Sequence, residues 1–425
     1  MPSYRAPGVY VEEVPGGTRP FGRVGTSSAG FVGVAPGKDA PRDVVVPVDN
    51  WTQFVRDFVG DATAGTHLST AVYGFFANGG SRAYVVNVGN GGSLTGTAKK
   101  PTGLTLLEAV DDVAIVAAPG FTDPASYDAL ISHCQHELRQ DRVAILDTVE
   151  EVDDVGRLTE VATVSASPAS SSTGDGSDSS TTGSGSGSAG PGSGSSGSTS
   201  SGGLRPPMSP GGYAAVYYPW LVVNDPVSGG QTTAPPSGHL AGVWARTDAT
   251  RGVHKAPANT TIAGALGLVR PVSKGEQEVL NPAGINCIRF FPGEGILVWG
   301  ARTLAPEASE FRYINVRRLT NMIKETVLKN TRWAVFEPNH HPLWAALRRD
   351  VTAFLTNVWR DGALVGQTPQ EAFFVKCDAE TNPPEVRDEG RVVTLIGIAP
   401  VKPAEFVVFQ LSQSADLATT ATTGA

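Results

Sequence analysis

A tract of small polar residues interrupts the chain between Ser165 and Gly203. In these 39 residues of a 425-residue chain, serine occurs 17 times, glycine 11 times and threonine 4 times. Such a stretch cannot bury enough apolar surface to offset its conformational entropy, so we predict that it is disordered. The tract leaves 164 residues before it and 222 after it. Two interpretations remain open: a linker between domains, or a solvent-facing insertion within one domain.

The overall composition excludes several classes of protein. A formal net charge of −8 argues against a dedicated nucleic-acid-binding protein, which needs a basic face to replace phosphate counterions. The three cysteines, Cys134, Cys287 and Cys377, are too few and too scattered for a disulfide framework or a zinc cluster, and they fit a reducing cytoplasm. Because no apolar run reaches roughly 18 residues and the N-terminus lacks an apolar segment, we expect neither membrane insertion nor a secretory signal.

Before the tract, the hydrophobic pattern alternates between strands and helices. Four short apolar runs are predicted as buried strands: Ala29–Val34, Ala83–Val88, Val113–Ala118 and Val143–Leu146. Three segments have a helical pattern: Trp51–Val59, His67–Ala77 and the residues after Asp123-Pro124, which form an N-cap and a first-turn proline. The last of these helices carries an apolar stripe that includes Cys134, and it connects two strands that we expect to pair in parallel.

After the tract, the pattern is mixed. An aromatic strand over Tyr213–Val223 is followed by a turn-rich stretch and then by a hairpin-like region, Ile285–Trp299. Two amphipathic helices are predicted over Ser309–Asn330 and Pro342–Asp361, with a strand at Trp333–Phe336 between them. The fold class is therefore mixed α/β and α+β.

Each end of the chain carries a lone extended segment. These segments are Pro7–Val14 and Glu405–Leu411, and proline- or glycine-rich stretches join them to the body. Unpaired strand backbone is a liability, so each segment must find a partner. Either the two segments close the chain's own sheet, or they are donated to a neighbouring subunit by strand addition.

The search for chemistry gives little. His133, His136 and Glu137 lie close together, but the segment lacks the second histidine of a zinc-protease helix, and no four ligands converge. Asp123 and Asp147 follow predicted strands and could line the carboxyl edge of a sheet, but we favour the simpler interpretation of a helix cap and a loop aspartate. No phosphate-binding loop, nucleophile elbow or Cys-x-x-Cys motif is present. We therefore assign no catalytic, cofactor or metal residues and expect no enzyme.

The charge pattern is more informative. Residues 309–361 carry nine Lys/Arg against five Asp/Glu, a local excess of four positive charges in an acidic chain. On the two predicted helices, Arg317 and Lys324 share one face, and Arg349 and Arg360 share another, both away from the apolar stripes. These faces are either ordinary solvated surface or a docking surface for an acidic partner.

A series of motifs in fixed order resembles a known family, the sheath proteins of contractile tails, across nearly the whole chain except the tract. The motifs of the first two thirds are Ala6-Pro-Gly-Val-Tyr-Val-Glu-Glu13, Phe76-Ala-Asn-Gly-Gly-Ser-Arg-Ala-Tyr-Val-Val86, Tyr217-Tyr-Pro-Trp220, Ala241-Gly-Val-Trp-Ala-Arg-Thr-Asp248 and Gly252-Val-His-Lys-Ala-Pro-Ala-Asn259. The final third contains Asn281-Pro-Ala-Gly-Ile-Asn286, Val298-Trp-Gly-Ala-Arg-Thr303, Tyr313-Ile-Asn-Val-Arg-Arg318, Phe336-Glu-Pro-Asn339, Gly362-Ala-Leu-Val-Gly366, Cys377-Asp378 and Pro403-Ala-Glu-Phe406. The family includes contractile phages, R-type pyocins and extracellular contractile injection systems.

The resemblance implies a structural subunit that stacks as six-fold rings around an inner tube and contracts without nucleotide hydrolysis. It implies an arm at 1–22, an outer α/β domain at 23–280 with the insertion 165–203, an inner tube-facing α+β domain at 281–411 built together with both chain ends, and a flexible tail at 412–425. The strand exchange would use Val9, Tyr10, Val11, Phe406, Val407, Val408 and Phe409. The implied partners are further copies of the chain, the tube, and baseplate and cap proteins, with no nucleic acid.

The resemblance also implies a location, which is the cytoplasm during assembly, followed by release as an extracellular particle or virion tail. Two other classes of protein remain as alternatives. One is an α/β hydrolase or ligand-binding enzyme that uses the carboxyl edge of the sheet. The other is a static surface-layer or shell protein, which would share the strand-donating ends but would show no second lattice state.

Overall fold

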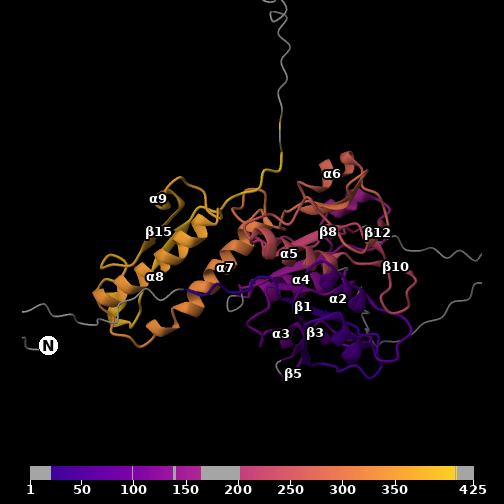
Figure 1. The fold of residues 1–425 in the computed structure, drawn as a ribbon, viewed down its shortest axis with the longest axis horizontal. Helices are drawn as coiled ribbons and strands as arrows, with labels where there is room; N and C mark the ends of the chain where they lie inside the picture. The colour runs from indigo at the N-terminus through magenta and orange to yellow at the C-terminus, as the bar shows by residue number, and fades with distance from the viewer. Residues whose placement is uncertain (1–20, 98, 137–139, 164–201, 407, 409–425) are drawn as a thin grey trace, which may run out of the picture.

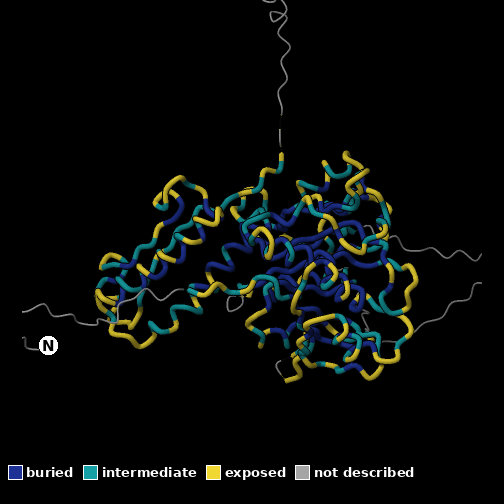
Figure 2. The backbone as a smooth tube through the Cα atoms, viewed as in Figure 1, coloured by how far each residue is buried: buried dark blue, intermediate teal, exposed yellow. Residues whose placement is uncertain are grey.

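The computed structural model describes residues 21–97, 99–136, 140–163, 202–406 and 408. The molecule is elongated and has two lobes (Figure 1). The sheet lobe, residues 28–304, contains the large sheet and its helices. The C-terminal lobe, residues 314–398, is drawn in orange and yellow, and its first helix runs out of the sheet lobe. Buried residues are concentrated in the sheet lobe (Figure 2).

The large sheet has nine strands in the order β11-β14-β13-β8-β7-β6-β1-β3-β2. Its strands are β1 (Ala29–Gly33), β2 (Val45–Val48), β3 (Ala83–Asn87), β6 (Ile115–Ala117), β7 (Val143–Asp147), β8 (Ala214–Tyr218), β11 (Thr260–Thr261), β13 (Ile285–Phe291) and β14 (Gly295–Trp299). The six central strands, from β13 to β3, are parallel, while β2, β14 and β11 pair in antiparallel fashion at the two edges. The predicted strand–helix–strand unit is confirmed, because β6 and β7 are parallel neighbours.

Helices cover both faces of this sheet, so the sheet lobe has three layers. One face packs against α2 (His67–Ala77) and α5 (Ser237–Arg251), and the other against α3 (Leu104–Leu107), α4 (Pro124–Gln135) and α6 (Lys274–Leu280). Adjacent residues of one strand serve opposite faces: Phe31 packs with the α2 and α5 side, and Val32 with the α3 and α4 side. Because both faces are covered, the strands are apolar on both sides. Cys134 is buried on the stripe of α4, as predicted.

The remaining elements of the sheet lobe are short. They are α1 (Trp51–Phe54), which continues as a π-helix η1 (Val55–Val59), the hairpin β4 (Thr95–Thr97) and β5 (Lys100–Gly103), the 3-10 helix η2 (Val155–Thr159), and a three-stranded sheet of β9 (Leu221–Asn224), β10 (Gln231–Ala234) and β12 (Ala265–Leu268). The predicted single strand over 213–223 is therefore two strands. The first strand, β8, ends at Tyr218, directly before Pro219. The second strand, β9, belongs to the smaller sheet.

The C-terminal lobe is built on two long helices. Its elements are α7 (Ile314–Asn330), the 3-10 helix η3 (Arg332–Ala334), α8 (His341–Arg360), α9 (Pro369–Ala372), β15 (Phe373–Lys376), α10 (Pro384–Asp388) and β16 (Leu395–Ile398). The apolar stripes of α7 and α8 meet β15 and β16 in a separate core. The strand predicted at Trp333–Phe336 is wrong: η3 occupies its first half, and Phe336 adopts a left-handed conformation with φ of 68°.

The tract is an insertion within the sheet lobe. The strands on either side of it, β7 and β8, are parallel neighbours in the same sheet. The segments that flank it are also paired, because Val161 and Arg205 form a bridge and the Ala162 amide donates to the Arg205 carbonyl at 2.8 Å. The interdomain linker interpretation is therefore excluded. The tract itself, except for Gly202 and Gly203, lies outside the described residues.

The predicted boundary between residues 280 and 281 cuts through this sheet. β13 and β14 follow that boundary in the sequence but pair with β8 and β11. The sheet lobe therefore continues to about residue 304, because main-chain hydrogen bonds tie these strands to the central strands.

Candidate assembly interface

The C-terminal lobe carries a sheet of only two strands. β15 and β16 pair in antiparallel register, with Phe373 opposite Ile398 and Val375 opposite Ile396. Those four side chains face the core formed with α7 and α8. On the opposite face, Phe374 lies over Gly397 and is 59% exposed. A two-stranded sheet is marginally stable alone, so this sheet depends on its helices and offers an apolar outer face to a partner.

The outer edges of these two strands are open along most of their length. Among the described residues, no strand pairs with the outer edge of β15, and β16 pairs only with β15. Beyond β16, residues 399–401 pair with residues 363–365, through the Leu364–Pro400 bridge. An open edge presents unpaired N–H and C=O groups and is a template for an added strand.

The chain enters the described structure beside this lobe and is held there by α7. The side chain of Asn330 makes two bonds to one residue: it accepts from the Gly22 amide at 3.2 Å and donates to the Gly22 carbonyl at 3.0 Å. The Phe21 ring packs on Phe354, with 5.8 Å between ring centroids. The first described residues are therefore anchored, although Val9, Tyr10 and Val11 lie outside the described residues.

The other end of the chain is anchored to the sheet lobe. The Arg302 guanidinium donates to both carboxylate oxygens of Glu405, at 2.7 Å each. Two further groups donate to the same carboxylate. They are the Asn281 side chain, at 3.0 Å, and the Tyr313 hydroxyl, at 3.2 Å. Burial alone would raise the pKa of Glu405, but the hydrogen bonds from Arg302 and Asn281 outweigh it and hold that pKa below its ordinary value.

The predicted donor strand begins directly after this anchor. Phe406 and Val408 are exposed and lie in no strand of the described structure. Val407 and Phe409 lie outside the described residues. Strand exchange stays a prediction for these residues. Exposed apolar side chains of this kind can form a surface that another subunit covers.

Arg317 is not a surface residue, so its predicted docking role is wrong. It is 5% exposed, and its guanidinium lies between two rings, 4.5 Å from the centroid of Tyr213 and 4.1 Å from that of Phe311. Its Nε donates to Asn321 at 2.9 Å. Burial lowers the pKa of Arg317. On a helical wheel, Arg317 lies off the apolar stripe of α7. In the folded chain, the ring of Tyr213 from the sheet lobe covers it.

The other three predicted docking residues are exposed. Lys324 lies on α7 and donates to Gln140 at 3.3 Å. Arg349 and Arg360 lie on α8, and Arg349 forms an ion pair with Asp350 at 3.0 Å. Arg349 and Arg360 therefore remain candidates for a basic docking surface on α8, and Lys324 remains a candidate on α7.

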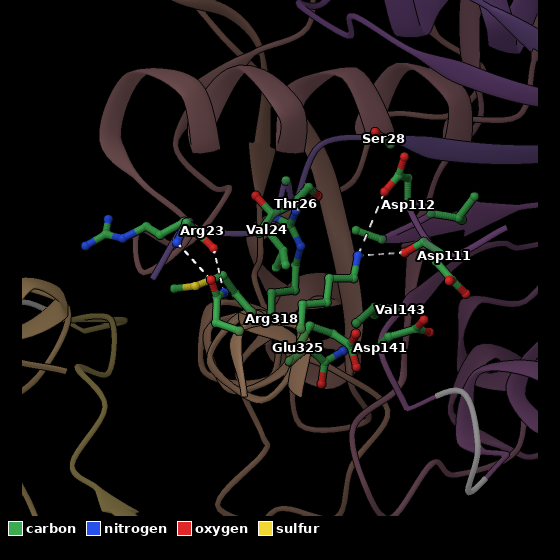
Figure 3. A pocket seen from close by; sticks show the side chains of 18 residues that line it. Arg23, Val24, Thr26, Ser28, Asp111, Asp112, Asp141, Val143, Arg318 and Glu325 are labelled. Atoms are coloured by element: carbon green, nitrogen blue, oxygen red, sulfur yellow. Dashed lines mark hydrogen bonds and ion pairs between the residues drawn. The ribbon is translucent and has the colours of Figure 1, made fainter. Parts of the chain in front are cut away.

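A cavity of about 520 Å³ separates α7 from the amino ends of β6 and β7 (Figure 3). Its walls include residues 22–26 and the acidic side chains of Asp112, Asp141 and Glu325. Lys329 crosses it, donating to the Asp111 carbonyl at 3.4 Å and lying 3.8 Å from Asp112. Burial, followed by the nearby charge of Asp141, raises the pKa of Glu325. This cavity marks the junction between the two lobes.

At the carboxyl edge of the large sheet, the two aspartates predicted to lie there make structural contacts. Burial raises the pKa of Asp147 to about 7, and its carboxylate accepts from the Ser237 amide at 2.8 Å and hydroxyl at 2.7 Å. Asp123 caps α4 by accepting from the Ser126 amide. Ser237 is fully buried at the start of α5, and its bonds to Asp147 tie that helix to the sheet.

The part of the chain that the structure describes offers neither a candidate metal site nor a candidate membrane span. His133 and His136 do not converge with other ligands, since no group of three or more His, Cys, Asp or Glu side chains there is arranged to hold a metal. No helix within the described ranges is long and apolar enough to cross a bilayer.

Sequence reasoning missed the two anchors of the chain ends. Arg302 and Glu405 are 103 positions apart, and Gly22 and Asn330 are 308 apart. The signal that could have found the first anchor was present, because Asn281, Arg302, Tyr313 and Glu405 each belong to a different motif of the final third. Only the fold brings those motifs together.

Comparisons with known proteins agree with this geometry. Residues 210–304 match the phage tail sheath protein central domain, and residues 307–414 match the phage tail sheath C-terminal domain. The chain is 30% identical over 190 residues to the tail sheath protein of Vibrio phage KVP40, an alignment that covers 43% of this chain and 27% of that protein. The chain thus spans about a quarter of the length of this relative.

Solved structures match almost the whole chain. The sheath complex of an extracellular contractile injection system, PVC, in the contracted state superposes with a TM-score of 0.72 at 26% identity, covering 98% of this chain and 99% of that chain. The baseplate structure of the anti-feeding prophage superposes with a TM-score of 0.69 at 26% identity, covering 97% and 100%.

The described part of the chain thus combines a mixed α/β sheet lobe with a smaller two-stranded sheet whose outer edges are open. The two sheath-domain models and these superpositions support placing the chain in the contractile tail sheath family. The mixed α/β fold that was predicted from the sequence is confirmed by the same comparisons.

Proposed function

We propose that this chain is the structural subunit of a contractile sheath, which polymerises as stacked six-fold rings around an inner tube and contracts to drive that tube through a target envelope. The observation that carries the proposal is the near-complete superposition on chains of two injection-system structures, a sheath complex in the contracted state and a baseplate. Contraction in this proposal is a change between two lattice states and uses no catalytic site.

Strand exchange would link the subunits. The open edges of β15 and β16 accept strands, and the arms that carry Val9 to Val11 and Phe406 to Phe409 donate them. What supports this assignment is the apolar outer face at Phe374 and Leu395 and the exposure of Phe406 and Val408. Main-chain hydrogen bonds would supply the affinity of each added strand, and alternate side chains its register.

Two deletions test the strand exchange. Removing residues 1–14 or residues 406–425 should leave a folded monomer that no longer polymerises, since the described anchors lie between those ends. Far-ultraviolet circular dichroism would report the fold, and sedimentation with negative-stain microscopy the polymer. A truncated chain that still forms cylinders would refute the exchange, and polymers that never adopt a second length would favour a static shell.

The basic surface of α8 would dock on acidic residues of the tube. Each exposed ion pair contributes only about 0.2–1 kcal/mol, but repetition on every subunit can bias the lattice between its extended and contracted states. The double variant Arg349→Glu, Arg360→Glu should give sheaths that assemble without tube or only in the contracted form. Lys324→Glu tests α7 separately, and Lys274→Glu, on an 84% exposed side chain of the sheet lobe, is the control.

An unchanged ratio of extended to contracted particles at low and high salt would mean that these basic faces are merely solvated. Baseplate and cap proteins complete the proposed assembly, which forms in the cytoplasm and is released as an extracellular particle or virion tail. What supports the released particle is the nature of the relatives, a phage tail sheath and an extracellular injection system.

A further inference from the structure

The segment that leads to the C-terminal arm crosses from one lobe to the other before it leaves the molecule. β16 ends at Ile398 in the C-terminal lobe, and the Val401 amide still donates to Ala363 of that lobe at 3.2 Å. Four residues later, Glu405 is bound by Arg302 of the sheet lobe. In Figure 1 this yellow segment passes from the C-terminal lobe toward the sheet lobe before its end.

The anchor that receives Glu405 is itself tied to the central sheet. The Arg302 amide donates to the side chain of Asn286 at 2.7 Å, and the same side chain donates back to the Arg302 carbonyl at 2.7 Å and to the Val216 carbonyl at 3.1 Å. Asn286 lies in β13 and Val216 in β8. Through these main-chain bonds, Arg302 joins the anchor to the central strands of the large sheet.

We infer that the contact of Glu405 with Arg302, Asn281 and Tyr313, here called the arm clamp, positions the C-terminal arm for donation to a second copy of this chain. The inference rests on the proposed function, and it adds the residues that set where the donated strand begins. Phe406, the first residue of the predicted donor strand, follows the clamp directly.

The physical reason is register. A strand that slips by one residue turns all of its side chains to the opposite face, so a donated strand needs a defined start. A clamp immediately before that start removes freedom that the arm would otherwise lose on binding, and this raises the effective concentration of the strand at the acceptor edge. The clamp also transmits a pull on the arm to the nine-stranded sheet and not to the two-stranded one.

The test uses the full chain with three variants. Glu405→Ala removes the clamp, Glu405→Gln keeps its shape and one acceptor oxygen but removes its charge, and Asp248→Asn breaks a buried pair with Arg318 that does not touch the arm. We expect the concentration needed for polymerisation to rise more than tenfold for Glu405→Ala and less for Glu405→Gln. Asp248→Asn should lower the melting temperature more than either Glu405 variant does, but it should impair assembly less than they do.

A mixing experiment separates positioning from stability. A Glu405→Ala subunit keeps its acceptor edge, so it should enter wild-type polymers but donate poorly, and a one-tenth fraction should shorten them in negative stain. A subunit that is merely unstable would stay out of the polymer and leave its length unchanged.

The inference is overturned if Glu405→Ala polymerises like wild type, or if assembly in all three variants simply follows their melting temperatures. Deletion of residues 406–425 distinguishes a failure of strand donation from a failure of the arm clamp. If that deletion leaves polymerisation intact, strand donation itself fails. If the deletion abolishes polymerisation while Glu405→Ala does not, only the clamp fails.

Discussion

In the large sheet the outermost strands are β2, four residues long with Pro47 in it, and β11, only two residues long. In the C-terminal lobe both strands of the small sheet are edge strands, and β15 has no described neighbour on its outer side. Short edges and proline discourage the addition of further strands, whereas an open four-residue edge beside exposed Phe374 invites it. The sheet lobe is therefore complete within one chain, and the C-terminal lobe is the part that a second subunit can complete.

Buried titratable groups in this molecule differ in whether a group of opposite charge faces them. In the sheet lobe Asp147 and His239 are buried without a counter-ion among their described contacts. At the junction the charges are paired: Arg318 of α7 donates to both oxygens of Asp248, at 2.9 and 2.6 Å, and to the Thr26 carbonyl at 2.8 Å. The junction therefore depends on a buried ion pair, and the sheet lobe buries a second one between Arg142 and Asp141 at 2.8 Å.

The largest expected effect comes from breaking that junction. Arg318→Met would leave Asp248 buried and without its guanidinium partner, which costs about 3–5 kcal/mol when one member of a buried pair is removed. Urea unfolding of the monomer should show this loss. The matched control is Lys274→Met, whose partner Glu278 is 3.9 Å away on an exposed helix face, and it should change stability by less than about 0.5 kcal/mol. A loss below about 1 kcal/mol for Arg318→Met would show that the junction does not need the pair.

Much of the sheet lobe could be predicted from the sequence because its elements have a clear period. α2 and α4 have an apolar stripe and a capped start, and both were predicted close to their observed bounds. α5 was missed, although it is 15 residues long. Ten of those residues are buried, so α5 has no polar face, and Gly238 and Gly242 pack directly against α2.

The candidate interface was predicted in part. The exposure of Arg349 and Arg360 follows from their position opposite the stripe of α8, which a helical wheel describes correctly. The burial of Arg317 could not be predicted, because the covering ring of Tyr213 comes from a residue about a hundred positions away. The same holds for the arm clamp, since contacts between distant segments depend on tertiary packing and not on local pattern.

The second effect is a pH dependence that arises from His239 and Asp147 of the sheet lobe. Burial lowers the pKa of His239 to about 4, so the folded state keeps this ring neutral while the unfolded chain takes up a proton below about pH 6.5. Stability should therefore fall as the pH drops from 6.5 to 4, by up to about 3 kcal/mol. The pKa of Asp147, raised to about 7, acts in the opposite sense, because its stabilising contribution is lost as the pH rises from about 4 to 7.

The variant His239→Gln isolates the histidine contribution. Because Asp147 is unchanged in this variant, the difference between the two stability profiles reports His239 alone. We expect the variant to lose less stability than wild type on acidification, measured by denaturant unfolding at half-unit steps of pH. Parallel profiles would show that His239 titrates normally in the folded state.

A smaller effect concerns the insertion. Residues 165–201 can be replaced by a four-residue Gly-Ser linker, which spares Gly202, whose carbonyl accepts from Arg157 at 2.8 Å. Closing a shorter loop costs less entropy, so the free energy of unfolding should rise by at most about 2 kcal/mol. Polymerisation should be unchanged. Loss of assembly with an intact fold would mean that the tract contacts another subunit.

The smallest effect tests Phe336, at the far end of the C-terminal lobe. This residue is fully exposed and has a φ of 68°, a conformation that glycine adopts without strain. Phe336→Gly should therefore stabilise the isolated subunit by up to about 1 kcal/mol relative to Phe336→Ala, which removes the ring but keeps the strained backbone. Thermal unfolding of the two variants measures the difference. Equal stabilities would mean that the surrounding loop does not hold this conformation, and a loss of assembly in both variants would identify the ring as a contact made only in the lattice.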